Sequence, residues 1–135
     1  MVNSQNINAK GDIAESIVVK AAKELKREAS VIRHVWHCSK NSPQDRQGID
    51  ILIFLEGGLC LPIQVKSSYR RLHRHHRVHP HIKHVIVVED SQILLYGDPN
   101  SEKYRALKKD LIRQSKLLIK KAVREAFYEL SRHNP

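Results

Sequence analysis

The sequence predicts an α/β domain in which a mixed β-sheet of about five strands is flanked by an N-terminal and a C-terminal helix. Two apolar runs joined by Gly57-Gly58 have the composition of a β-hairpin, and further short apolar runs follow at residues 84–89 and 92–96. Helical periodicity is present in the first and last parts of the chain. With 135 residues the chain can bury one hydrophobic core, so we expect a single domain over residues 1–135.

The first part of the chain predicts a helix, a strand and a loop in that order. Residues 9–29 repeat apolar side chains every three to four positions, and Asn8 is a suitable N-cap. Residues 31–37 alternate as a strand does, whereas residues 38–47 are polar, contain Pro43 and predict a loop.

The remaining elements are predicted by the same patterns. The strands of the hairpin lie within residues 49–66, and a further strand covers residues 84–89. Asp90-Ser91 predicts a tight turn into a strand at residues 92–96. Helical spacing then runs from about residue 102 to 131, with lysines and arginines on the outer face of the predicted helix.

The charge of the chain indicates a polyanionic partner. The formal net charge is +10, which favours nucleic acid first and an anionic membrane surface second. No acidic residue lies between Glu56 and Glu89, so the intervening segment is a concentrated positive surface. We expect its arginines to contact phosphates; they are Arg70, Arg71, Arg74 and Arg77. Its histidines match no zinc-ligand spacing, and a solvated loop without a role is the alternative.

Several classes of protein are disfavoured. No apolar run approaches the roughly 18 residues that cross a bilayer, so we expect no membrane protein. The first residues lack the basic and apolar regions of a secretion signal. Cys38 and Cys60 have no C-x-x-C spacing and are expected to be reduced thiols of a cytoplasmic protein.

Polar residues at the ends of the hairpin strands predict a metal-dependent hydrolytic site. Asp50 begins the first strand, and Gln64 and Lys66 end the second. Asp50 is the natural primary ligand of Mg²⁺ or Mn²⁺, Gln64 can offer a neutral oxygen, and Lys66 can orient water or stabilise charge. Glu15 lies at the edge of the apolar helix stripe and can supply a further carboxylate.

Each of these residues also has a purely structural interpretation. Asp50 can be a strand-start cap, Lys66 an edge residue that extends its amine to water, and Glu15 a solvated acid near a helix N-terminus. The length of the hairpin loop tests the site hypothesis. A two-residue turn would pair Asp50 with Val65 and put Asp50 on the wrong face. The site therefore requires an odd loop length, such as three residues, or a bulge, for which Pro62 is suitable.

Together, Glu15, Gly48-x-Asp50 and Gln64-x-Lys66 resemble the PD-(D/E)xK nuclease superfamily, and in particular archaeal Holliday-junction resolvases and Mrr-like restriction endonucleases. Lys10-Gly11-x-x-Ala14-Glu15 is similar to the entry helix of those resolvases. The resemblance covers about residues 10–68. It implies a restriction-endonuclease-like fold, metal-dependent DNA cleavage, and often a homodimer.

The chain departs from the family pattern at two positions. Ile49 replaces the usual proline, and Gln64 replaces the usual acid, which removes one negative charge from the expected metal shell. A non-catalytic nucleic-acid-binding protein on the same fold is therefore the alternative. An adaptor for membrane surfaces or acidic proteins is disfavoured, because no predicted helix pairs a basic face with exposed aromatics.

Overall fold

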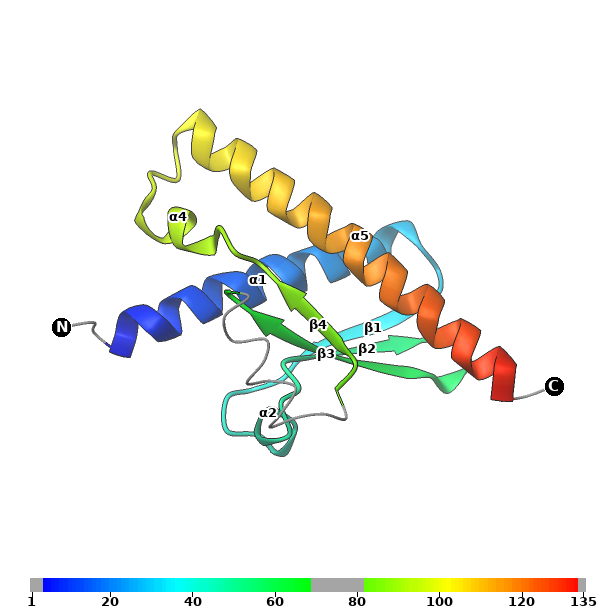
Figure 1. The fold of residues 1–135 in the computed structure, drawn as a ribbon. Coiled ribbons are helices and arrows are strands. Elements are labelled where there is room, and N and C mark those ends of the chain that lie inside the picture. The colour runs from blue at the N-terminus through cyan, green and yellow to red at the C-terminus, as the bar shows by residue number, and fades with distance from the viewer. Residues whose placement is uncertain (1–3, 69–81, 134–135) are drawn as a thin grey trace.

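A computed structural model of the chain describes residues 4–68 and 82–133 (Figure 1). Residues 1–3, 69–81 and 134–135 lie outside the described part. The described elements are α1 (Ser4–Glu28), β1 (Ile32–His37), α2 (Pro43–Arg46), β2 (Ile51–Leu55), the 3₁₀ turn η1 (Glu56–Gly58), β3 (Cys60–Lys66), β4 (His84–Val87), α4 (Ser91–Tyr96) and α5 (Glu102–His133).

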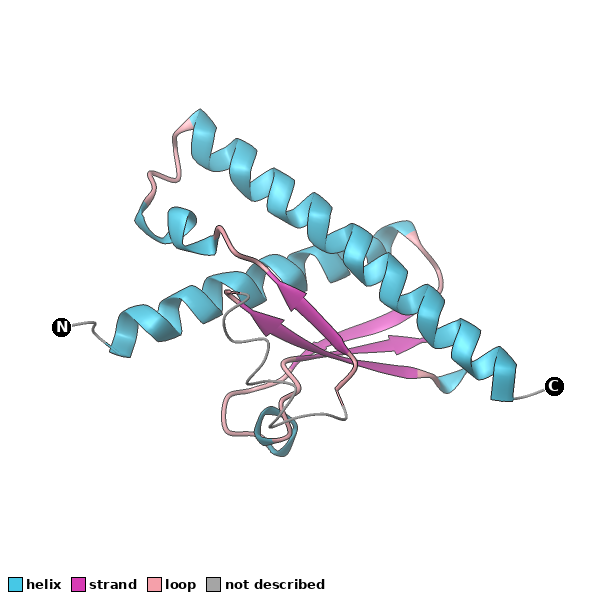
Figure 2. Ribbon diagram, viewed as in Figure 1, coloured by secondary structure: helices cyan, strands magenta, loops and turns pink. Residues whose placement is uncertain are grey.

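The strands form one mixed sheet in the order β1-β2-β3-β4. β1 pairs with β2 and β2 with β3 in antiparallel fashion, whereas β3 and β4 are parallel. Figure 2 shows the two long helices crossing above this sheet, and β1 is one of its edge strands. The prediction of a mixed sheet with helices at both ends of the chain is confirmed at this level.

One face of the sheet and the two long helices share a hydrophobic core. Ile51 and Ile53 of β2 and Ile63 of β3 are fully buried in it, together with Ile17 of α1 and Ile119 of α5. The alternation of these strands points their other side chains to the opposite face. Both long helices therefore pack on the same face of the sheet, whereas Gln64 and Lys66 of β3 alternate to the opposite face.

The predicted fifth strand at residues 92–96 is wrong, because these residues form helix α4 and the described sheet has four strands. Ser91 begins the helix and donates a side-chain hydrogen bond to the carbonyl of Val88 at 3.0 Å. Leu94 is buried against the core while Ile93 and Tyr96 stay exposed. A run of four apolar residues suits either structure, and packing against α1 selected the helix.

Two boundaries in the first part of the chain also differ from the prediction. Helix α1 begins at Ser4, so Asn8 lies inside it and is not its N-cap. The predicted loop at residues 38–47 contains the short helix α2, because Pro43 is accepted at a helix start. The hydroxyl of Ser42 caps this helix by accepting a hydrogen bond from the backbone N–H of Asp45 at 3.2 Å.

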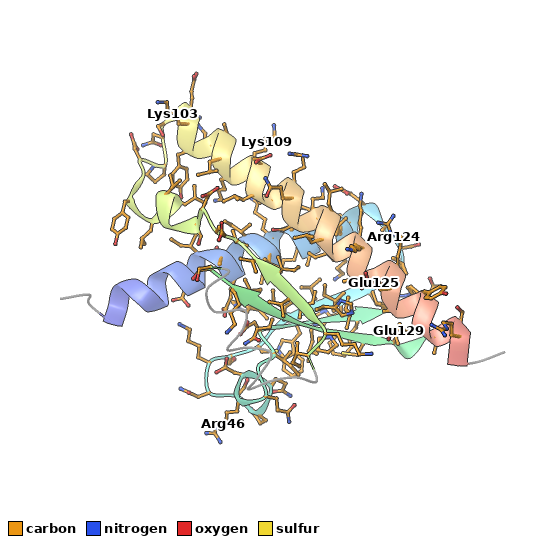
Figure 3. The ribbon with its side chains drawn as sticks, in the orientation of Figure 1. Arg46, Lys103, Lys109, Arg124, Glu125 and Glu129 are labelled. Atoms are coloured by element: carbon orange, nitrogen blue, oxygen red, sulfur yellow. The ribbon has the colours of Figure 1, made fainter. Side chains whose placement is uncertain are left out.

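Basic side chains extend along α5. Figure 3 shows Lys103, Lys109 and Arg124 spread over the length of this helix, and all three are exposed. Acidic partners are present near its C-terminal end, where Glu129 lies 3.5 Å from the amine of Lys83. Among the described residues, no helix has the length and apolar character that a membrane span requires.

Candidate active site

The hairpin loop has the odd length that the site hypothesis requires. Glu56, Gly57 and Gly58 join the strands, and Ile51 pairs with Ile63. Just beyond this pair, the backbone N–H of Asp50 donates to the carbonyl of Ile63 and its side chain accepts from the N–H of Val65, so Asp50 lies beside the end of β3 that carries Gln64 and Lys66.

The alternative of a bulge at Pro62 is wrong. Pro62 pairs regularly with Leu52, and the irregularity of the described sheet lies in β1, between Ile32 and His34. Gly57 and Gly58 adopt φ values of 84° and 80°, which glycine tolerates and other residues resist. The loop sequence therefore accounts for the register.

Asp50 is held by hydrogen bonds at the head of β2. Its backbone N–H donates to the carbonyl of Ile63 at 3.0 Å, and its own carbonyl accepts from the N–H of Cys38 at 2.9 Å. Its side-chain Oδ2 accepts a further hydrogen bond from the N–H of Val65 at 2.8 Å. The residue is only 8% exposed, so its carboxyl group is fixed in a nearly dry position. It also satisfies a backbone donor, as the strand-cap interpretation proposed.

The environment of Asp50 raises the pKa of its carboxyl group to about 7. Burial is the main cause, because a charged carboxylate loses hydration there. The hydrogen bond from Val65 lowers this pKa, whereas the charge of Glu15 and a hydrogen bond with it raise it. Lys66 lowers it through its positive charge. The structure therefore brings Glu15, Asp50 and Lys66 within electrostatic range of one another.

Glu15 reaches this edge of the sheet from α1. Its side chain is 19% exposed, and its Oε2 lies 3.0 Å from Nε2 of His37. Glu15 is thus not the solvated helix acid of the alternative interpretation. His37 was not predicted as part of the site. The available signal was its position at the end of a strand, next to the segment that leads to Asp50.

Gln64 contributes a buried oxygen that has no partner among the described residues. The residue is 6% exposed, and its Oε1 makes no hydrogen bond within the part of the chain that the structure describes. A buried acceptor of this kind is unfavourable unless a donor or cation satisfies it. Lys66, two residues along the strand, is half-buried and shares this face.

The donor set suits a hard divalent cation. Within residues 4–68 and 82–133, no group of three His, Cys, Asp and Glu side chains lies close enough to form a metal cage. Mg²⁺ does not need one, because one or two carboxylates and retained waters are its usual ligands in proteins. Glu15 and Asp50 supply two carboxylates, and the unsatisfied Oε1 of Gln64 supplies a neutral oxygen.

The predicted phosphate-binding arginines, Arg70, Arg71, Arg74 and Arg77, lie outside the described residues. The candidate active site therefore consists of Glu15, Asp50, Gln64 and Lys66, with His37 beside it. Compared with known proteins, the chain matches no family model, no curated protein and no solved structure.

Proposed function

We propose that the protein is a metal-dependent endonuclease that hydrolyses phosphodiester bonds of DNA. The observation that carries this proposal is the meeting of two acids at one sheet edge, where the pKa of Asp50 is raised to about 7 beside Glu15. Perturbed carboxyl groups close to a lysine are typical of catalytic sites. The net charge of +10 suits a polyanionic substrate.

Each residue has a definite part in this proposal. Glu15, Asp50 and Gln64 would hold the cation, which neutralises charge on the phosphate and increases the acidity of water. The amine of Lys66 would donate a hydrogen bond to the attacking water or to a non-bridging phosphate oxygen. The water oxygen forms a bond to phosphorus, the bond to the leaving sugar oxygen breaks, and that oxygen takes up a proton.

His37 would position Glu15 rather than touch the substrate. The contact of 3.0 Å between its Nε2 and Oε2 of Glu15 restricts the orientation of the carboxylate. A ligand fixed by a neighbouring side chain binds a metal more tightly than a free one.

A non-catalytic nucleic-acid-binding protein is the second candidate, and Gln64 is the observation that favours it. An amide in place of an acid leaves the site with two carboxylates instead of three. Such a protein would bind DNA with a strong dependence on salt but without turnover. The raised pKa of Asp50 would then be a consequence of burial and of the neighbouring Glu15, without a role in catalysis.

Cleavage of branched, linear and supercoiled DNA in the presence of Mg²⁺ or Mn²⁺ tests the proposal. We expect Asp50→Asn and Lys66→Gln to reduce the rate by about 100-fold or more, in line with the loss of a metal ligand or charge-stabilising group. Asp98→Asn is the matched control, because Oδ1 of Asp98 also accepts a backbone hydrogen bond, from Asn100 at 3.0 Å, but the residue is exposed.

Two outcomes decide between the candidates. No cleavage of any DNA by the wild-type protein, or equal cleavage by Asp50→Asn, contradicts the nuclease proposal. DNA binding by Asp50→Asn that equals or exceeds wild-type binding, without turnover in either protein, identifies the binding protein instead.

A further inference from the structure

Helix α1 separates two open grooves of similar size. One groove, of about 770 Å³, lies between α1 and α5, and the other, of about 780 Å³, lies between α1 and β1. Lys20 lines both grooves. Their charges differ, and this difference indicates which groove suits a polyanion.

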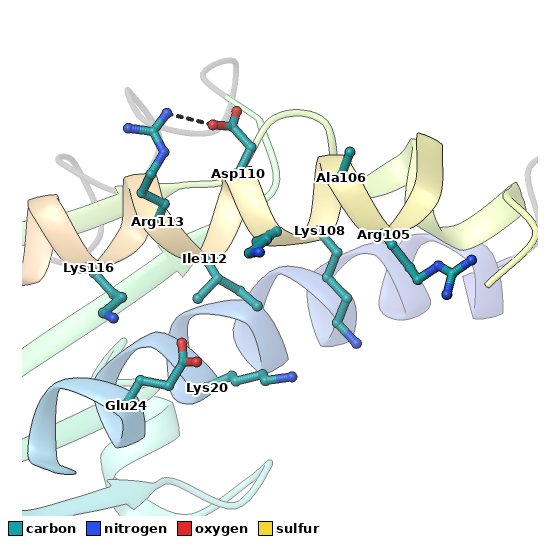
Figure 4. Close-up of a pocket in the computed structure, with 10 residues that line it drawn as sticks. Lys20, Glu24, Arg105, Ala106, Lys108, Asp110, Ile112, Arg113 and Lys116 are labelled. Carbon is teal, nitrogen blue, oxygen red and sulfur yellow. Dashed lines mark hydrogen bonds and ion pairs between the residues drawn. The ribbon is translucent and has the colours of Figure 1, made fainter. Parts of the chain in front are cut away.

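The groove between α1 and α5 contains acids as well as bases. Figure 4 shows Glu24 and Lys20 entering it from α1, whereas Arg113 and Asp110 of α5 point away from α1. Asp110 Oδ1 lies 2.6 Å from the Arg113 guanidinium, and the Lys116 amine lies 2.6 Å from a carboxylate oxygen of Glu28. Much of its positive charge is therefore compensated within the protein.

The groove between α1 and β1 has no acidic lining residue within the described chain. Its titratable lining residues are all bases: Lys20, Lys23, Lys26, Arg27, His34 and His37. The three lysines and the arginine are exposed, so their charges face solvent in the groove. Cations clustered along one exposed helix face attract phosphates strongly.

This groove is continuous with the candidate active site through His37. The same imidazole that lines the groove lies 3.0 Å from the carboxylate of Glu15. From Glu15 to Arg27, α1 rises by about 18 Å at 1.5 Å per residue. That length corresponds to roughly five phosphates of a duplex strand at 3.4 Å per nucleotide.

We propose that the α1/β1 groove binds the phosphodiester backbone of the nucleic acid to one side of the scissile phosphate. The statement that the bound backbone lies to one side of the scissile phosphate rests on the proposed nuclease function. β1 is an edge strand, so the groove lies at an open side of the described sheet. The bound strand would pass His37 and follow the cations of α1 toward its C-terminal end.

Salt-dependent DNA binding by charge-neutralised variants tests this assignment. We expect Lys23→Gln combined with Lys26→Gln to weaken binding severalfold, and to reduce the slope of log K against log salt by about 1.8 for a duplex or about 1.4 for a single strand. Lys121→Gln combined with Arg124→Gln is the matched control, because it removes two exposed cations of α5 that line neither groove. Thermal unfolding of each variant verifies that it is folded.

The groove assignment is overturned if the α1 double variant retains the affinity and slope of the control variant. It is also overturned if the α1 variant loses binding only to vesicles of anionic lipid and keeps its affinity for DNA. These results are separable from the nuclease proposal. A wild-type protein that never cleaves, together with an α1 variant that loses DNA binding, refutes catalysis but retains the groove. Normal cleavage and binding by the α1 variant refutes the groove alone.

Discussion

The side-chain Oδ2 of Asp50 accepts a hydrogen bond from the backbone N–H of Val65 at 2.8 Å, which links the head of β2 to the end of β3. This bond keeps the carboxyl group of Asp50 at the sheet edge even though burial raises its pKa to about 7. The local fold thus holds an acid in a position that opposes its ionisation. Such strain is tolerated at functional sites and has consequences that can be measured.

The first consequence is a dependence of stability on pH. The unfolded chain releases the Asp50 proton near the ordinary pKa of 3.8, whereas the folded protein keeps it to about pH 7. The folded state therefore binds more protons in this interval, and the free energy of unfolding falls as the pH rises from about 4 to about 7. The contribution is on the order of a few kcal/mol, at about 1.4 kcal/mol per pKa unit.

Asp50→Asn should remove this pH dependence. The amide oxygen of asparagine can still accept the hydrogen bond from Val65, and no charge is buried. We expect the variant to exceed the wild type in stability at pH 8 and to lose that advantage near pH 4, as measured by urea unfolding. The exposed control Asp98→Asn should follow the wild-type curve. A stability difference between the wild type and Asp50→Asn that stays constant between pH 4 and 7 would contradict a raised pKa.

The second consequence concerns divalent cations. An ion held by Glu15 and Asp50 would offset the repulsion between the two carboxylates and favour their charged forms. At ten times its dissociation constant, Mg²⁺ should stabilise the wild type by about 1.4 kcal/mol at pH 7.5, and EDTA should reverse the effect. Thermal unfolding with and without the ion measures this stabilisation.

Variants locate the ion. Glu15→Gln and Asp50→Asn should lose most of the stabilisation by Mg²⁺, whereas Asp98→Asn should keep it. Equal stabilisation of all four proteins would mean that the ion binds elsewhere on the surface.

Parts of the fold were predictable because their patterns are long. The helical stripes of α1 and α5 extend over several turns, and their apolar residues recur with one period. The strand prediction at residues 92–96 was wrong because so short a run fits a strand as well as a helix, and contact with α1 decided between them. In a short apolar run the periodicity is too weak to identify the element, so contacts with the rest of the fold decide whether it forms a strand or a helix.

The prediction of the candidate site depended on the length of the hairpin loop, which the sequence did not establish. The spacing of Asp50, Gln64 and Lys66 specified a common face if the turn had three residues, but the sequence did not show where each strand ended. The involvement of His37 depended on the pairing of β1 with β2, a contact between segments distant in sequence. Residue spacing therefore predicted the groups within one hairpin and missed the group brought by another strand.

Glycine substitutions provide a test of the backbone geometry that sets this register. Gly11 lies in α1, and no atom of the described chain comes within 4 Å of the position that an added Cβ would take. Gly11→Ala should therefore stabilise the protein by about 0.5–1 kcal/mol. Gly57 and Gly58 have similar free space but positive φ angles, so alanine at either position should destabilise by about 1–2 kcal/mol.

Urea unfolding measures whether each variant is more or less stable than the wild type. Gly58→Asn should be milder than Gly58→Ala, because asparagine tolerates the left-handed region better than alanine does. Stabilisation by alanine at position 57 or 58 would contradict the loop conformation, and with it the register that pairs Ile51 with Ile63.

Gln64→Glu adds a third carboxylate to the candidate site and should couple stability to metal more strongly. Gln64 is buried and its Oε1 has no partner in the described chain, so a third carboxylate there would add a negative charge beside Glu15 and Asp50 that Lys66 alone would oppose. In EDTA at pH 8 we expect the free energy of unfolding to fall by about 1–3 kcal/mol, and Mg²⁺ should reverse this loss because a more negative donor set binds the ion more tightly.

Gln64→Leu is the control for side-chain volume, since it removes the oxygen without adding charge. It should be at least as stable as the wild type in EDTA and gain less stability from Mg²⁺ than the wild type does. If Mg²⁺ raised the unfolding temperature of Gln64→Glu, Gln64→Leu and the wild type equally, Gln64 would lie outside any metal shell, and the site would reduce to its two carboxylates.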